Sequence, residues 1–227
     1  MFSFDMLLPA FTAIKDGFLL TLVITAASFA LGQVAALPIA LALVSPRGWL
    51  RRPASIYTFF VRGSPLLVQL FIVYYGLGQM DIVRESFLWP MLRSALYCAI
   101  LTIGLNSAAY TAELLAGAIR DLPLGQWEAG KALGLSKPVL IFKVVLPQIY
   151  RSVLPTIGNE LILVMKGSTL ASAVTVMEMT GAARIFVART YAPFETFAMA
   201  GAVYLLLGAF FGRMFKSLEN RIAIPGR

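Results

Sequence analysis

Residues 128–134 read Glu128-Ala129-Gly130-Lys131-Ala132-Leu133-Gly134, and this polar stretch continues through Leu135 to Leu146-Pro147 between long apolar segments. Glu128–Leu133 is predicted to form one short helix, which Gly134 ends because glycine readily adopts the left-handed backbone of a C′ position. A second helix is predicted over Val139–Val145, with Pro147 limiting its extension. The pattern indicates a compact helix–turn–helix outside the bilayer, shaped to fit a groove of another protein. The alternative is an ordinary loop that joins two membrane helices.

The composition indicates an integral membrane protein. The chain has 227 residues, of which 59% are hydrophobic and 13% charged, and its mean hydropathy is +0.81. Soluble domains are about 45–50% apolar and ~25% charged. The net charge of +8 comes from basic residues spread through the loops, as in cytoplasmic membrane loops, and not from one nucleic-acid-binding face.

Several functional classes lack the residues that they need. The chain has no histidine, and Cys98 is its single cysteine, so we expect no disulfide within the chain, no His/Cys metal site and no His-based triad. Gly125, Gly130 and Lys131 nearly spell a phosphate-binding loop. Ala132 stands where a Ser or Thr would hold Mg²⁺, and no strand precedes the glycines. We therefore expect no ATPase site and no cofactor in this chain.

The apolar pattern predicts a single all-α membrane domain over residues 1–227 with five spans. A short interfacial helix is predicted over 1–13, a basic turn over 45–53, and a polar connection over 184–193. The predicted spans are 17–44, 56–77, 89–119 (the longest), a short irregular fourth span at 155–165, and 197–215. In the second span, Pro65 removes a backbone donor and biases Ser64 away from helix, which predicts a break.

The positive-inside rule predicts the orientation of the chain. With the N-terminus outside, twelve basic residues lie on the inner side and six on the outer side, with Arg62 unassigned. Because basic residues favour the cytoplasmic side, we expect the N-terminus outside and the C-terminus in the cytoplasm. The polar stretch at about residues 120–148 then faces the cytoplasm.

The same stretch resembles the "EAA loop" of ABC importer permeases, which reads E-A-A, three residues, G, nine residues, I, one residue, L-P. Gly130 replaces the second Ala and Val144 replaces the Ile. The resemblance implies that this loop docks on an ATP-hydrolysing subunit. The coupling residues that it implies are Glu128, Ala129, Gly130, Gly134, Leu146 and Pro147.

Further stretches are similar to the polar amino-acid uptake branch of these permeases, and most of all to histidine and opine (octopine, nopaline) permeases. They are Phe60–Leu66, Phe87–Arg93, Leu105–Glu113, Gly158–Glu160 and Lys166–Ser172. The resemblance implies a type I ABC importer permease fold in a bacterial inner membrane. It also implies a second permease subunit, two ATPase subunits that bind ATP and Mg²⁺, and an extracytoplasmic substrate-binding protein.

Acidic residues inside spans are the candidates for substrate contact, because they are costly there and normally face protein or water. Glu160 lies in the irregular fourth span and Asn106 in the third, while Ser168 and Thr169 could add neutral hydrogen bonds. A structural role for Glu160, paired with Lys166 or a partner subunit, is equally open. Glu113 lies near the inner end of its span, where we expect it to form an ion pair with Arg62.

The sequence therefore predicts the permease subunit of an ATP-driven importer for polar amino acids, cationic ones in particular, or opine-like derivatives. It is predicted to be a transporter component and not an enzyme. The alternative is a stand-alone secondary transporter or channel for small polar solutes, against which stand the small size of the chain and the lack of internal repeats.

Overall fold

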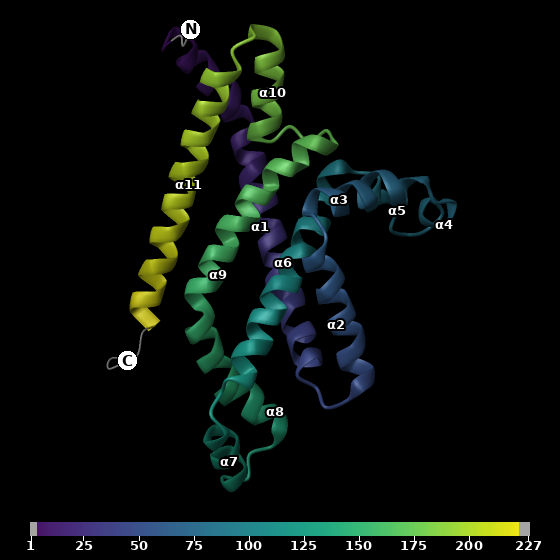
Figure 1. Ribbon diagram of the computed structural model, residues 1–227, viewed down its shortest axis with the longest axis vertical. Coiled ribbons are helices and arrows are strands. Elements are labelled where there is room, and N and C mark those ends of the chain that lie inside the picture. The colour runs from purple at the N-terminus through teal and green to yellow at the C-terminus, as the bar shows by residue number, and fades with distance from the viewer. Residues whose placement is uncertain (1–3, 223–227) are drawn as a thin grey trace.

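The computed structural model describes residues 4–222, and within that range it contains helices, turns and no strand (Figure 1). The longer helices are α1 (Leu7–Leu43), α2 (Gly48–Gly63), α6 (Ala95–Arg120), α7 (Leu124–Ala132), α9 (Leu146–Ser168), α10 (Met179–Thr190) and α11 (Pro193–Ile222). The shorter ones are η1 (Phe4–Met6), α3 (Leu66–Phe71), the π-helical η2 (Ile72–Gly76), η3 (Leu77–Gln79), α4 (Asp81–Arg84), α5 (Trp89–Leu92), α8 (Lys137–Val139), the π-helical η4 (Leu140–Val145) and the 3₁₀ helix η5 (Thr169–Val174).

Within the described residues, four helical segments are long and apolar enough to cross a membrane, and a bent pair makes up to five. The bent pair is α2 with the segment Leu66–Gln79, which turn by 107° at the break. Ser64, which precedes Pro65, has the extended backbone that a following proline imposes (φ −115°, ψ 147°). The all-helical class and the break at Pro65 are thus confirmed.

The N-terminal region differs from the prediction. From Leu7 onward α1 is one continuous helix of 37 residues, so the described part of residues 1–13 forms no separate interfacial helix; residues 1–3 lie outside the described range. Pro9 falls in the first turn of α1, where the missing N–H breaks no helical hydrogen bond. Similarly, α2 begins at Gly48, so Pro53 lies inside a helix and not in a basic turn.

The prediction of a short, discontinuous fourth span is wrong. Helical structure runs from Lys137 to Val174, and Pro147 and Pro155 do not end it. The π-helical turn η4 ends at Val145, two residues before Pro147, and a wider turn of this kind accommodates a proline ring. The third span is not the longest, because α6 has 26 residues and α5 is separate from it. The predicted polar connection 184–193 lies mainly in α10.

The bundle is organised around the contact between α1 and α6, which is the most extensive helix pair in the structure. Small residues line the contact. A methyl group added to Gly32 of α1 would lie 2.9 Å from Ser107 Oγ, and one added to Gly104 of α6 would lie 3.0 Å from the Ser28 carbonyl oxygen. Small residues let membrane helices approach this closely.

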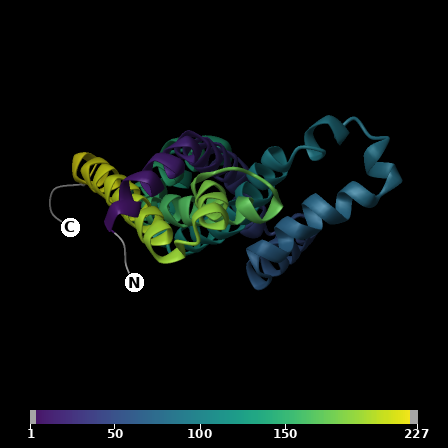
Figure 2. The same ribbon diagram turned by 90° about the horizontal axis from the view of Figure 1, so that it is seen from above.

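The arrangement of the helices separates two ends and one lateral arm. In Figure 1, α1 begins at one end of the long axis, while α7 and α8 lie at the other end, toward which α11 also runs. Figure 2 shows that α3, α4 and α5 extend to one side, away from the bundle. The break at Ser64–Pro65 therefore redirects the chain out of the bundle before α6 re-enters it.

Candidate functional site

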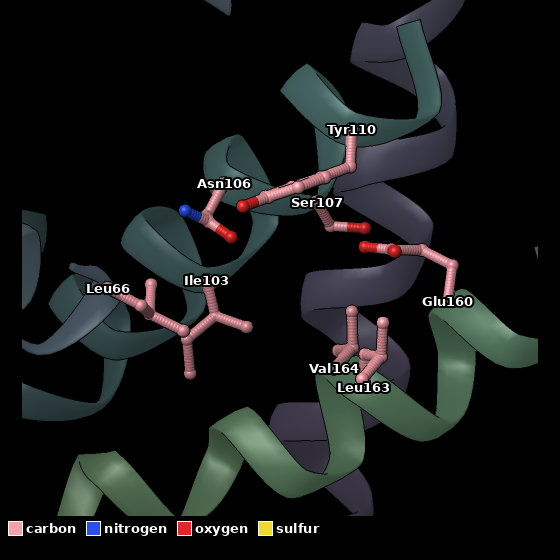
Figure 3. Close-up of a pocket in the computed structure, with 8 residues that line it drawn as sticks. All are labelled: Leu66, Ile103, Asn106, Ser107, Tyr110, Glu160, Leu163 and Val164. Atoms are coloured by element: carbon pink, nitrogen blue, oxygen red, sulfur yellow. The ribbon is translucent and has the colours of Figure 1, made fainter. Parts of the chain in front are cut away.

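A cavity of about 210 Å³ lies where α3, α6 and α9 meet. Its lining combines aliphatic walls with four polar side chains (Figure 3). The lining residues are Leu66 from α3, Ile103, Asn106, Ser107 and Tyr110 from α6, and Glu160, Leu163 and Val164 from α9. Apolar walls with a few polar groups are typical of small-molecule sites.

Glu160 is the acidic residue of this cavity. It is half-buried on continuous α9, so the prediction that it lies in an irregular span is wrong. Within residues 4–222 no ion pair joins Glu160 to Lys166 or to any other cation. The carboxylate thus remains available to a cationic ligand or to a partner subunit.

Ser107 faces Glu160 from the opposite wall (Figure 3). Its side chain is buried, and its Oγ forms no hydrogen bond of standard geometry with the part of the chain that the structure describes. Gly32 leaves the space for this hydroxyl. The sequence reasoning missed Ser107, although a small polar residue directly after Asn106 in an apolar span was a usable signal.

Asn106 and Tyr110 connect the cavity to the broken span. Asn106 Nδ2 donates a hydrogen bond to Gln69 Oε1 of α3 at 3.1 Å. Tyr110 Oη donates to the Arg62 carbonyl at 3.4 Å, and the Arg62 guanidinium lies 5.4 Å from the Tyr110 ring centroid. Gln69 was also missed by the sequence reasoning.

The structure does not bring Ser168 and Thr169 into the cavity. Ser168 is buried at the end of α9 and donates to the Met165 carbonyl at 2.7 Å. Thr169 donates to the Lys166 carbonyl at 2.7 Å. Both hydroxyls therefore satisfy local helix carbonyls, as Ser and Thr commonly do. Neither residue lines this cavity, and a substrate contact at Ser168 or Thr169 stays a prediction.

Arg62 and Glu113 lie together, with 3.8 Å between Arg62 Nη1 and Glu113 Oε1. Thr58 Oγ1 also donates to Glu113 Oε1 at 2.7 Å. The side chains of Arg62 and Glu113 are 44% and 26% exposed, so this pair is not deeply buried. The long distance and the exposure both weaken the ion pair.

The second candidate surface is the turn between α7 and α8. Gly134 has φ +68°, its N–H donates to the Lys131 carbonyl at 2.9 Å, and the Leu135 N–H donates to the Gly130 carbonyl at 3.0 Å. These two hydrogen bonds form the Schellman motif that ends α7. Gly130 is buried against Leu140, and an added methyl group would overlap the Leu140 side chain. The replacement of the second Ala of the EAA pattern by glycine thus makes room for Leu140.

The other coupling residues fall into two groups. Glu128 and Ala129 are exposed on α7. Leu146 is 5% exposed and packs in the bundle core, while the adjacent Pro147 is exposed at the start of α9. Glu128, Ala129, Gly134 and Pro147 are therefore the exposed members of the predicted coupling set, and Gly130 and Leu146 are its buried members.

A buried carboxylate that the sequence reasoning missed ties three helices together. Glu178 caps the N-terminus of α10, where its oxygens accept from the Thr180 and Gly181 N–H groups, each at 2.9 Å. Tyr204 of α11 donates to Glu178 Oε2 at 2.6 Å, and the Met179 N–H donates to Thr21 Oγ1 of α1 at 3.1 Å. A glutamate opening an apolar stretch was the available signal, but Glu is not among the usual N-cap residues.

Comparison with known proteins identifies the family to which the chain belongs. Residues 28–224 match the family described as "binding-protein-dependent transport system inner membrane component". The octopine transport system permease protein of Rhizobium radiobacter is 46% identical over 209 residues, which cover 92% of this chain and 85% of the relative. The nopaline transport system permease protein of Agrobacterium fabrum is 40% identical over 188 residues, covering 82% of this chain and 78% of the relative. The histidine/lysine/arginine/ornithine permease protein of Escherichia coli is 37% identical over 206 residues, covering 90% and 87%.

The solved structures agree with these sequence relatives. An amino acid ABC transporter crystallised with histidines superposes with a TM-score of 0.84 at 29% identity, over 97% of this chain and 99% of that chain. An inward-facing methionine ABC transporter has the same fold, with a TM-score of 0.78 at 18% identity, over 98% of this chain and 100% of that one. The resemblance to histidine and opine permeases is therefore confirmed. This chain belongs to the family of inner-membrane components of binding-protein-dependent transport systems, as a permease subunit of the amino-acid and opine ABC importers.

Proposed function

We propose that this subunit imports a cationic amino acid or an opine-like derivative, and that Glu160 holds the cationic group of the solute in the cavity between α6 and α9. The relatives named above carry octopine, nopaline and basic amino acids, which supports this substrate class. A cation that leaves water inside a membrane protein needs a compensating negative charge. The observation that carries the proposal is the carboxylate of Glu160, which lines the cavity and has no ion-pair partner within residues 4–222.

The test of Glu160 compares two solutes of matched shape. L-Arginine ends in a guanidinium group and L-citrulline in an uncharged ureido group of similar size. Glu160→Gln keeps the shape of the side chain and removes its charge, so uptake into proteoliposomes should fall more for arginine than for citrulline. The control is Glu219→Gln, which makes the same change on the exposed end of α11. An equal loss for both solutes, or none for either, would give Glu160 a structural role only.

The turn around Gly134 is proposed as the contact with a partner ATPase, which binds ATP and Mg²⁺ in place of this chain. Exposed Glu128, Ala129 and Gly134 at the end of the bundle support this role. The remaining assembly would comprise a second, homologous or identical permease subunit, a second ATPase subunit and a substrate-binding protein. Co-purification of the chain with an ATPase tests the coupling. Uptake that persists after deletion of the ATPase would favour a stand-alone transporter or channel.

The orientation follows from the same proposal. With α7 in the cytoplasm, α1 begins on the outer side and α11 runs toward the inner side, because α1 begins at the end of the bundle opposite to α7 (Figure 1). The basic residues of the loops support this orientation. Protease cleavage of a tag at either terminus, in right-side-out and inside-out vesicles, tests it.

A further inference from the structure

The break between α2 and α3 leaves backbone carbonyls without helical partners, and one side chain satisfies them. Gln69 Nε2 donates to the Val61 carbonyl at 2.7 Å, to the Ser64 carbonyl at 3.0 Å and to Ser64 Oγ at 2.9 Å. Pro65 creates this need, because it supplies no N–H and bends the pair by 107°. Gln69 is therefore the residue that closes the break.

The same contacts fix the orientation of the Gln69 amide. A backbone carbonyl only accepts hydrogen bonds, so the amide atom that faces Val61 and Ser64 has to be the nitrogen. The Gln69 oxygen is consequently turned toward α6, where Asn106 lies at 3.1 Å. This assignment follows from the chemistry of the partners, which is how amide orientations are established.

The orientation of Gln69 in turn determines that of Asn106. Because Gln69 Oε1 only accepts, Asn106 has to present its NH₂ group to it. The Asn106 oxygen then remains for the cavity. Figure 3 shows the Asn106 nitrogen turned away from Glu160 and its oxygen on the side that faces the other lining residues.

We infer that Gln69 is a positioning residue for solute selectivity. Its NH₂ group is held by the carbonyls at the helix break, so its oxygen holds the NH₂ group of Asn106 and turns the Asn106 oxygen to the cavity. The cavity then has hydrogen-bond acceptors on two sides. Asn106 Oδ1 is one acceptor and the Glu160 carboxylate is the other. Such a site suits a guanidinium or ammonium group, which donates hydrogen bonds and accepts none. A ureido or carboxamide group brings its own oxygen, which would face an acceptor in at least one orientation. This inference rests on the proposed function of the cavity.

The experiment measures binding of L-arginine and L-citrulline to the intact permease–ATPase complex in lipid nanodiscs, without the binding protein, so that only the cavity selects. Gln69→Met keeps the length of the side chain and removes both the donor and the acceptor. Asn106 is then free to turn, and the arginine-over-citrulline affinity ratio should fall about tenfold, the effect of one hydrogen bond to a charged group. Ser64→Ala is the control, because it removes one of the partners of Gln69 and leaves both carbonyls and Asn106 in place.

A second variant separates positioning from a merely structural role. In Gln69→Met/Asn106→Asp, a carboxylate presents an acceptor to the cavity in every orientation, so the preference for arginine should return although the break stays unsatisfied. The inference is overturned if Gln69→Met weakens both ligands by the same factor, or if the double variant does not recover the ratio. Should the Gln69→Met complex fail to assemble, Asn106→Leu decides: a lower ratio supports the cavity acceptor, and an unchanged ratio overturns it.

Glu160→Gln, measured in parallel, separates failure of the proposed role of Gln69 from failure of the proposed function of the cavity. If it lowers the ratio while Gln69→Met does not, the proposed site stands and the role of Gln69 is wrong. If wild type shows no preference for arginine, or Glu160→Gln leaves the preference unchanged, the proposed function itself fails, and the inference with it.

Discussion

The turn at Gly134 allows a test of coupling that changes the backbone and adds almost no bulk. Gly134 has φ +68°, and a methyl group added there would meet nothing within 4 Å. Gly134→Ala therefore introduces backbone strain without a clash, and the left-handed conformation costs an alanine about 1–2 kcal/mol. That energy corresponds to a loss of about 5- to 30-fold in the population of the correctly turned loop. If this turn transmits ATPase motion, uptake should fall by a similar factor.

The assay is solute uptake per ATP hydrolysed in proteoliposomes that contain the permease, its ATPase and the binding protein. Gly134→Asn is the matched comparison, because asparagine tolerates the left-handed region, so it should retain more uptake than Gly134→Ala. Gly134→Asp adds a charge at the proposed contact and should lower uptake further than Gly134→Asn. Gly125→Ala, in α7 with open space around the new methyl group, should leave uptake unchanged. Equal activity of the Ala, Asn and wild-type proteins would refute the reasoning.

Three further predictions concern the stability of the purified complex. Glu178→Ala should lower it by about 1–3 kcal/mol, because it removes a helix cap and the 2.6 Å hydrogen bond that the part-buried Tyr204 hydroxyl donates, leaving that hydroxyl only the longer contact with Thr180 Oγ1; an unchanged thermal midpoint would contradict this. Gly32→Ala should cost about 1–3 kcal/mol by forcing α1 and α6 apart at Ser107, as measured by thermal unfolding, and a change below about 0.5 kcal/mol would mean that the helices adjust freely. A double-mutant cycle on Arg62 and Glu113 should give about 1 kcal/mol or less, since the pair is 3.8 Å apart and partly exposed; a coupling of about 3–5 kcal/mol would indicate burial in the assembly.

The features that the sequence predicted correctly are those with a local backbone cause. Pro65 breaks its span because proline restricts both itself and the preceding residue, and Gly134 ends α7 because glycine lacks the Cβ that disfavours a positive φ. The same reasoning failed at Pro147 and Pro155, which lie inside continuous helix. A proline changes the course of a helix only when neighbouring turns cannot accommodate it, and the π-helical turn before Pro147 depends on tertiary packing that the sequence does not display.

The residues of the candidate site were also only partly predictable from the sequence. Glu160 and Asn106 stood out because a polar residue in an apolar span is costly, and both line the cavity. Ser168 and Thr169 do not line this cavity, and each hydroxyl bonds to a carbonyl of its own helix, which removes the cost of a polar group in an apolar span. The role of Gln69 was missed since it arises from contacts with both sides of a bend, which only the three-dimensional structure brings together.

The unbroken helical segment from Lys137 to Val174 has a mechanical consequence. Glu160 lies 23 residues after Lys137 on this segment, a distance of about 35 Å along a helix that rises 1.5 Å per residue. A displacement imposed on α8 therefore reaches the Glu160 carboxylate along one continuous helical segment and needs no relay of side chains. Two softer places lie on this path, η4 beside α8 and the turn at Pro155, which lacks one helical hydrogen bond. Because the helix continues through both, we expect a push on α8 to tilt the segment and to swing Glu160 relative to Asn106 on α6. Motion of the ATPase would thus move the α9 wall of the cavity relative to the α6 wall.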